Sequence, residues 1–90
     1  MAIRVEFYGV PRQRAGVSSV ELPARAEITL GAVLTELAGQ FPELAVDCIS
    51  GESLQRAAAV SLDGDRFVRD PATLLSDGQC LLLLSADAGG

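Results

Sequence analysis

The residues whose type and position best suit chemical work are two glycines at the end of the chain, Gly89 and Gly90. Glycine has no Cβ, so a glycine pair makes a narrow end that adopts backbone conformations closed to other residues. Such an end can enter the active site of a second protein, which can bind its backbone as an added strand. The carboxylate of Gly90 is therefore the first candidate reactive group, with Ala88 and Gly89 as the tail that leads to it.

Groups for autonomous catalysis are scarce in the sequence. The chain contains no histidine and no lysine, and no cysteine or serine stands beside a plausible base. Two cysteines without histidine cannot complete the tetrahedral donor set of zinc. Asp63 and Asp65 fall in a turn sequence, so we expect them to form the turn rather than bind metal. We predict no autonomous catalytic site, no bound cofactor and no metal.

Charge and composition limit the kinds of partner. The net charge is −5 and the sequence has no basic stripe, which argues against nucleic acid and favours a basic protein partner. No apolar run approaches the roughly 20 residues that span a bilayer, and the start lacks the order of a secretory signal. We expect a cytoplasmic protein without membrane contact, and reduced thiols at Cys48 and Cys80 rather than a disulfide.

The elements that must position the tail are mostly strands. Period-two alternation, apolar runs and flanking turn residues predict strands over residues 3–8, 17–22, 57–62, 66–68 and 80–84. The first two should form an N-terminal hairpin. Asp63-Gly64 should join the next two, because both central residues of the favoured hairpin turn need positive φ.

One segment has the pattern of a helix. Thr29 suits the N-cap, and an apolar stripe follows it at Leu30, Val33, Leu34, Leu37 and Phe41. Because Pro42 disfavours helix at the residue before it, the helix should end within 38–40. We expect a connection over 42–55 with one helical turn around 43–48, and a tight turn or a single 3₁₀ turn over 71–75. Three aromatic side chains are expected to fill the core: Phe7, Phe41 and Phe67.

This order of elements predicts an α+β protein with the ubiquitin-like β-grasp fold. A mixed sheet of about four to five strands should carry one main helix across one face, with the first and last strands side by side in its centre. We divide the chain into a β-grasp domain over 1–84 and a flexible C-terminal tail over 85–90 that ends in Gly-Gly.

Several segments in this order match those of a known family. They are the first strand leading into 12–16, Thr29-Leu30-Gly31, Phe41-Pro42-Glu43-Leu44, the turn over 62–65, and 75–78 leading to Ala88-Gly89-Gly90. On these segments the sequence resembles the MoaD/ThiS sulfur carriers, relatives of ubiquitin, along almost its whole length. Two residues depart from the family pattern: Ser85 stands where many members have proline, and Asp87 stands where a small or apolar residue is usual.

The resemblance implies a cycle carried out by partner enzymes. An E1-like enzyme would use ATP to adenylate the Gly90 carboxylate. A sulfurtransferase or cysteine desulfurase would supply persulfide sulfur, leaving Gly90 as a thiocarboxylate. The length and the sequence Phe-Pro-Glu-Leu look most like the small subunit of molybdopterin synthase, whose large subunit would accept the sulfur. Thiamine, cysteine or thiosugar synthesis would use the same tail.

Two other functions remain open at this stage. The chain could be a ubiquitin-like modifier that is joined to protein lysines through Gly90, or an interaction module whose glycines are incidental. For any of them a docking face is expected on the last strand. If Leu81 and Leu83 point into the core, Leu82 and Leu84 point to the other face, where a partner or neighbouring side chains must cover them. Phe67 completes the predicted partner-binding set.

Overall fold

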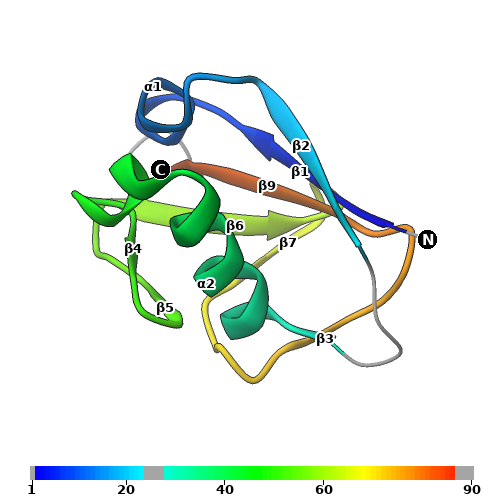
Figure 1. The fold of residues 1–90 in the computed structure, drawn as a ribbon. Coiled ribbons are helices and arrows are strands. Elements are labelled where there is room, and N and C mark those ends of the chain that lie inside the picture. Colours follow the sequence, from blue (N-terminus) through cyan, green and yellow to red (C-terminus); the bar gives the residue numbers. More distant parts are fainter. Residues whose placement is uncertain (1, 24–27, 87–90) are drawn as a thin grey trace.

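The computed structural model describes residues 2–23 and 28–86, and Figure 1 shows a sheet with one main helix across it. In chain order the elements are β1 (Ala2–Phe7), α1 (Val10–Ala15), β2 (Ser19–Pro23), β3 (Ile28–Thr29), α2 (Leu30–Gln40), the 3₁₀ helix η1 (Pro42–Ala45), β4 (Ile49–Ser50), β5 (Ser53–Leu54), β6 (Ala58–Leu62), β7 (Arg66–Val68), β8 (Leu74–Leu75) and β9 (Cys80–Ser85).

The main sheet has five strands in the order β2-β1-β9-β6-β7. Strand β1 runs parallel to β9 and antiparallel to β2, while β6 runs antiparallel to both β9 and β7. The first and last strands therefore lie side by side at the centre, as the sequence predicts. The predicted β-grasp fold, with its mixed sheet and single main helix, is confirmed.

Helix α2 forms where its capping residue and apolar stripe predict it. The Thr29 hydroxyl accepts a hydrogen bond from the Ala32 amide at 3.1 Å, which satisfies one of the free N–H groups of the first turn. The helix ends at Gln40, and Phe41 packs edge-on against Phe7 with ring centroids 5.6 Å apart. An aromatic contact thus fixes the end of α2 against the first strand.

The core lies between α2 and one face of the sheet. On the helix the first four residues of the predicted stripe are buried, while Phe41 follows the last helical residue and is partly buried. On β1 and β9 alternate residues face the helix, which is the periodicity of a half-covered sheet. The buried apolar side chains of these three elements are Ile3, Val5, Phe7, Leu30, Val33, Leu34, Leu37, Leu81 and Leu83.

Three short features differ from the sequence prediction. Helix α1 occupies a stretch that glycine and proline mark as a turn, and it ends at Gly16 in a left-handed conformation. The connection before β6 contains the antiparallel pair β4–β5, and the predicted turn over 71–75 includes β8, which pairs with β3. Each of these elements is stabilised by contacts made after the chain has folded back, so local sequence gives a weak signal for it.

Two single residues also differ from their expected positions. Phe67, expected in the core, is 60% exposed, because on β7 it is the neighbouring Val68 that packs against the core. Ser85, expected to begin a tail too small to pack, is the last residue of β9 and is only 7% exposed. The strand therefore continues one residue beyond the predicted boundary of the domain.

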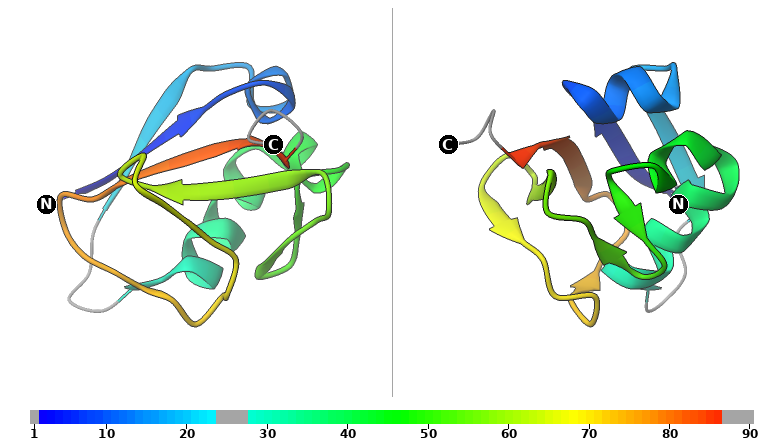
Figure 2. Two further views of the ribbon diagram at one scale, coloured as in Figure 1. Left: turned by 180° about the vertical axis from the view of Figure 1, so that it is seen from behind. Right: turned by 90° about the vertical axis from the view of Figure 1, so that its left-hand side faces the viewer.

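The two faces of the sheet are covered unequally. Figure 2 shows α2 and η1 on the same side of the five strands. In the part of the chain that the structure describes, no helix lies over the opposite side, which we call the outer face.

Candidate docking face and tail root

The predicted partner-binding residues come together on the outer face. Leu82 on β9 stands opposite Ser61 on β6, and Ser61 stands opposite Phe67 on β7. Leu84 stands opposite Ala59 in the next row. Directly opposed residues of antiparallel strands share a face, so these five side chains form one cluster across three strands. We call it the apolar patch.

The apolar patch combines a closed centre with an exposed margin. Ser61 is only 6% exposed although it lies on the uncovered face, because Leu82 and Phe67 flank it. Leu82 and Leu84 are half-buried, and Phe67 is exposed on the strand at the edge of the sheet. Neighbouring strands thus shield the leucines in part, while Phe67 remains exposed.

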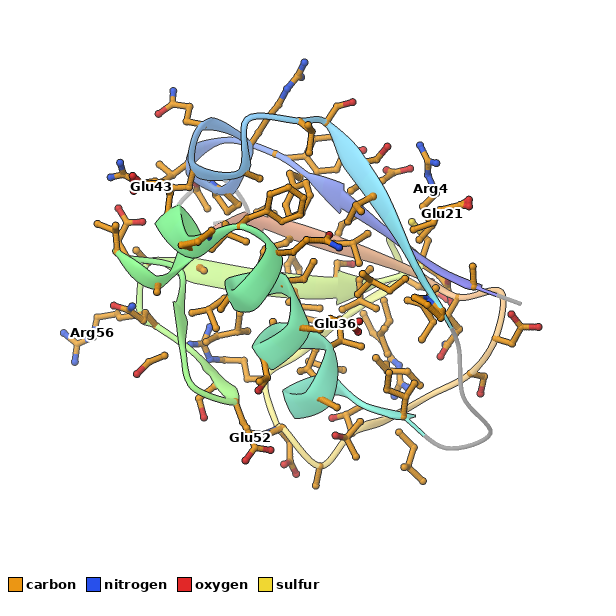
Figure 3. The ribbon with its side chains drawn as sticks, in the orientation of Figure 1. Arg4, Glu21, Glu36, Glu43, Glu52 and Arg56 are labelled. Atoms are coloured by element: carbon orange, nitrogen blue, oxygen red, sulfur yellow. The ribbon has the colours of Figure 1, made fainter. Side chains whose placement is uncertain are left out.

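The other half of the outer face is polar and internally bonded. On β1 the Glu6 carboxylate accepts a hydrogen bond from the Tyr8 hydroxyl at 2.5 Å and one from Arg4 Nε at 2.9 Å. The bond from Tyr8, followed by that from Arg4, lowers the pKa of Glu6, and the same carboxylate raises the pKa of Tyr8. Arg4 on β1 and Glu21 on β2 stand directly opposite each other and lie together on this polar half of the face (Figure 3).

The tail root, which we define as Ser85 and Ala86, is held from both sides. The Val10 amide donates to the Ser85 hydroxyl at 2.9 Å, and the Ala86 amide donates to the Ala57 carbonyl at 2.8 Å. Just before it, the Tyr8 amide donates to the Leu83 carbonyl at 2.9 Å. The last strand is therefore bonded on both edges up to the point where the tail begins.

The predicted reactive end lies outside the described residues. Gly90, Gly89 and Ala88 are not placed by the structure, and neither is Asp87, so the prediction for the carboxylate remains a prediction. The sequence singled out Ser85 only as a departure from the family pattern, and it did not single out Ser61. The period-two pattern of β6 provided a signal for Ser61, since alternation with buried Val60 and Leu62 sends it to the outer face. Nothing local provided one for Ser85.

The thiols do not make a second reactive site. Cys48 and Cys80 are both free, and burial raises the pKa of Cys48 to about 12. Burial also raises the pKa of Cys80, so neither thiol is an activated nucleophile at neutral pH. Among the described residues, no group of acidic and cysteine side chains is arranged to hold a metal ion. Within the same residues, no helix is long and apolar enough to cross a membrane.

The fold places the chain among ubiquitin-like β-grasp proteins. No protein-family model matches the sequence, and no curated protein matches it. Solved structures do match. Small archaeal modifier protein 1 from Haloferax volcanii is 20% identical, with a TM-score of 0.80 over 100% of both chains.

Two further structures have the same fold and different described roles. A putative molybdopterin converting factor, subunit 1, from Pyrococcus furiosus is 17% identical with a TM-score of 0.77, over 94% of this chain and 97% of that one. A chain of the Amycolatopsis orientalis BexX/CysO complex is 24% identical with a TM-score of 0.75, over 99% of this chain and 100% of that one. The resemblance to the MoaD/ThiS carriers is thereby confirmed at the level of the fold.

Proposed function

We propose that this chain is a ubiquitin-like sulfur carrier whose Gly90 carboxylate is adenylated by an E1-like enzyme and converted to a thiocarboxylate. The observation that carries the proposal is the position of β9. This strand is central in the sheet, is paired with β1 through Leu83 and with β6 through Ser85, and stands two residues before Ala88-Gly89-Gly90 in the sequence. A rigid strand followed by a narrow end suits a carboxylate that must reach into another protein's active site.

The chemistry needs only a carboxylate from this chain. A Gly90 oxygen attacks the α-phosphorus of ATP, and pyrophosphate leaves. The terminal sulfur of a partner's persulfide then attacks the acyl carbon, and AMP leaves. A thiol cleaves the resulting sulfur–sulfur bond, which gives the thiocarboxylate and a disulfide. Adenylation is needed because a carboxylate is a poor electrophile, whereas an acyl-adenylate has a good leaving group.

The outer face supports docking that is separate from this chemistry. The apolar patch provides a contact whose centre is already shielded from water, and the exposed Phe67 ring at its margin is a large aromatic side chain of the kind enriched at interfaces. The bonded polar residues of β1 border the patch, so they form a polar rim. The partners proposed for this face are the adenylating enzyme and the sulfur-accepting enzyme.

The acceptor that we favour is the large subunit of molybdopterin synthase. The sequence segment Phe41-Pro42-Glu43-Leu44 supports it, and so does the structural likeness to a protein described as a molybdopterin converting factor. Sulfur donation to thiamine, cysteine or thiosugar synthesis is the alternative within the same chemistry. Conjugation to protein lysines is a second candidate function, favoured by the likeness to an archaeal modifier protein.

Intact mass spectrometry tests the proposal directly. The chain is incubated with the E1-like enzyme of its host, ATP and a persulfide source, and we expect one oxygen to be exchanged for sulfur. A variant that lacks Gly90 should remain folded and gain no sulfur. If an enzyme that is active on another carrier leaves the mass of this chain unchanged, the carrier function is refuted. Adducts between Gly90 and lysines of other proteins in cell extract would instead support conjugation.

A further inference from the structure

Ser85 caps a helix that is 75 positions away in the sequence. Helix α1 begins after Gly9, which has no side chain to satisfy the free N–H groups of the first turn. The Ser85 hydroxyl takes that role, because it accepts the hydrogen bond from the Val10 amide at 2.9 Å. This hydrogen bond therefore joins the end of β9 to the start of α1, and Figure 1 shows these two segments side by side.

Gly9 provides the space that this bond requires. Its backbone has φ 65° and ψ −133°, a conformation that side chains disfavour. A Cβ on Gly9 would lie 2.5 Å from Ser85 Oγ, which is closer than real Cβ contacts allow. The glycine and the buried hydroxyl thus fit each other, and we call this pair the bracket.

The opposite edge of the tail root has its own support. The Ala86 amide donates to the Ala57 carbonyl, and the next carbonyl, that of Ala58, accepts from Arg69 Nη1 at 2.6 Å. A second nitrogen of the same guanidinium donates to the Gln55 carbonyl at 3.2 Å. Arg69 therefore holds the segment against which Ala86 is bonded.

From these contacts we infer that Ser85 is a positioning residue, which fixes where the tail begins and so where the carboxylate can be presented to the adenylating enzyme. The inference rests on the proposed function. Four residues follow Ala86 in the sequence, so the end reaches at most about 14 Å beyond the bracket. Without the bracket, Ser85 and Ala86 would be held on one edge only, by their backbone contacts with Ala58 and Ala57, so this end of β9 would open more often. In the open state the tether begins after Leu84, and its six residues reach about 21 Å and sample more directions.

The two tether lengths predict an effect on kcat, which distinguishes a role in positioning the carboxylate from a role in docking. The effective concentration of a tethered group falls with the three-halves power of tether length, so lengthening the tether from four residues to six lowers it about twofold. Loss of direction adds to this factor. Docking through the apolar patch is unaffected, so kcat for adenylation should fall, with tether length alone accounting for up to about twofold, while KM stays the same.

The test is the variant Ser85→Ala, with Ser53→Ala as a matched control on an exposed strand away from the tail root. Amide hydrogen exchange at Val10 and Ala86 reports the bracket without any partner. We expect about five- to tenfold faster exchange at both amides in Ser85→Ala, the factor expected for one lost hydrogen bond, and no change in Ser53→Ala. Exchange at the Phe7 amide, which donates to the Ser18 carbonyl, should be unchanged and shows that the fold persists.

Kinetics with the adenylating enzyme complete the test. Faster exchange together with lower kcat and unchanged KM supports the inference. If amide exchange in Ser85→Ala is unchanged, the Ser85 hydroxyl does not hold this end of β9. If exchange is faster but kcat is unchanged, Ser85 has no positioning role. A raised KM with unchanged kcat assigns Ser85 to docking and also overturns it. The wild-type chain shows whether the proposed function itself has failed, because it would then gain no sulfur from the adenylating enzyme. In that case the positioning role is also refuted, whereas amide hydrogen exchange still tests whether the hydrogen bond between Val10 and Ser85 is present.

Discussion

Replacing Phe67 by alanine should remove most of the affinity for the adenylating enzyme. The ring is 60% exposed, and a phenylalanine offers about 200 Å² to a contact, so roughly 120 Å² is available for a partner to bury. At about 25 cal/mol per Å² this area contributes ~3 kcal/mol, of which the alanine retains a part. We therefore expect a loss of about 2 to 3 kcal/mol, a roughly 30- to 150-fold rise in Kd.

The chain offers a matched control at Leu74. Its side chain is 61% exposed, and it lies on β8 in the separate β3–β8 pair, away from the apolar patch. Leu74→Ala therefore removes similar intramolecular contact without touching the outer face. Binding of both variants to the enzyme is measured by calorimetry, and their stability by urea unfolding. Equal Kd values for Phe67→Ala and the wild-type chain, or equal losses in both variants, would refute docking through the outer face.

Three further predictions concern the fold and its titrating groups. Gly39→Ala should raise the free energy of unfolding in urea by about 0.5 to 1 kcal/mol, because nothing lies within 4 Å of its new Cβ. Gly31→Ala should gain less or destabilise, because its Cβ would lie 2.9 Å from a Glu52 oxygen and 3.1 Å from the Glu52 Cβ. Tyr8 is the only tyrosine and the chain has no tryptophan, so ultraviolet titration reports it alone. Glu6 raises the pKa of Tyr8, so the midpoint should lie above the usual value, and Glu6→Gln should lower it. The hydrogen bond between Tyr8 and Glu6 therefore stabilises the folded chain fully below the pKa that tyrosine has in the unfolded chain. This stabilisation is lost as the pH rises through the higher pKa of Tyr8 in the folded chain. A thiol reagent at neutral pH should leave Cys48 unmodified until the chain is unfolded in urea, because burial raises its pKa to about 12.

Local sequence signals were sufficient for the elements that carry most of the sheet and core. Three of these signals come from residues that are close together in the sequence. They are the alternation of β1, the N-cap and apolar stripe of α2, and the turn residues Asp63-Gly64. Both turn residues have positive φ, as the favoured hairpin turn requires. The separation of Leu82 and Leu84 from the core follows from the same periodicity, so the apolar patch was partly predictable.

Features that depend on distant contacts were not predictable from local patterns. Helix α1 has only six residues, too few for stability in isolation, and it forms where it packs on β9 and η1. Phe67 was misassigned to the core because composition alone favours burial of a phenylalanine and cannot tell which face of an edge strand it takes. The bond between Ser85 and Val10 joins positions that only the folded topology brings together.

Strand β9 contributes residues to the core, to the proposed docking face and to the tail root, so its register decides which side chains reach each of the three. A slip of one residue would exchange Leu81 and Leu83 with Leu82 and Leu84, burying the patch and exposing the core. The register is bonded at both ends. At the start, the Cys80 amide donates to Asp63 Oδ1 at 2.9 Å and the Asp63 amide donates to the Cys80 carbonyl at 2.7 Å.

At its other end, β9 is fixed by the Ser85 hydroxyl. Between these points the strand is paired with β1 on one edge and with β6 on the other. A strand that only filled the core would tolerate polar or apolar residues alike on its outer face. The combination of half-buried leucines, a buried serine at the end and bonds at both termini is instead what a carrier needs, because docking and presentation of its carboxylate must be in fixed relation to each other.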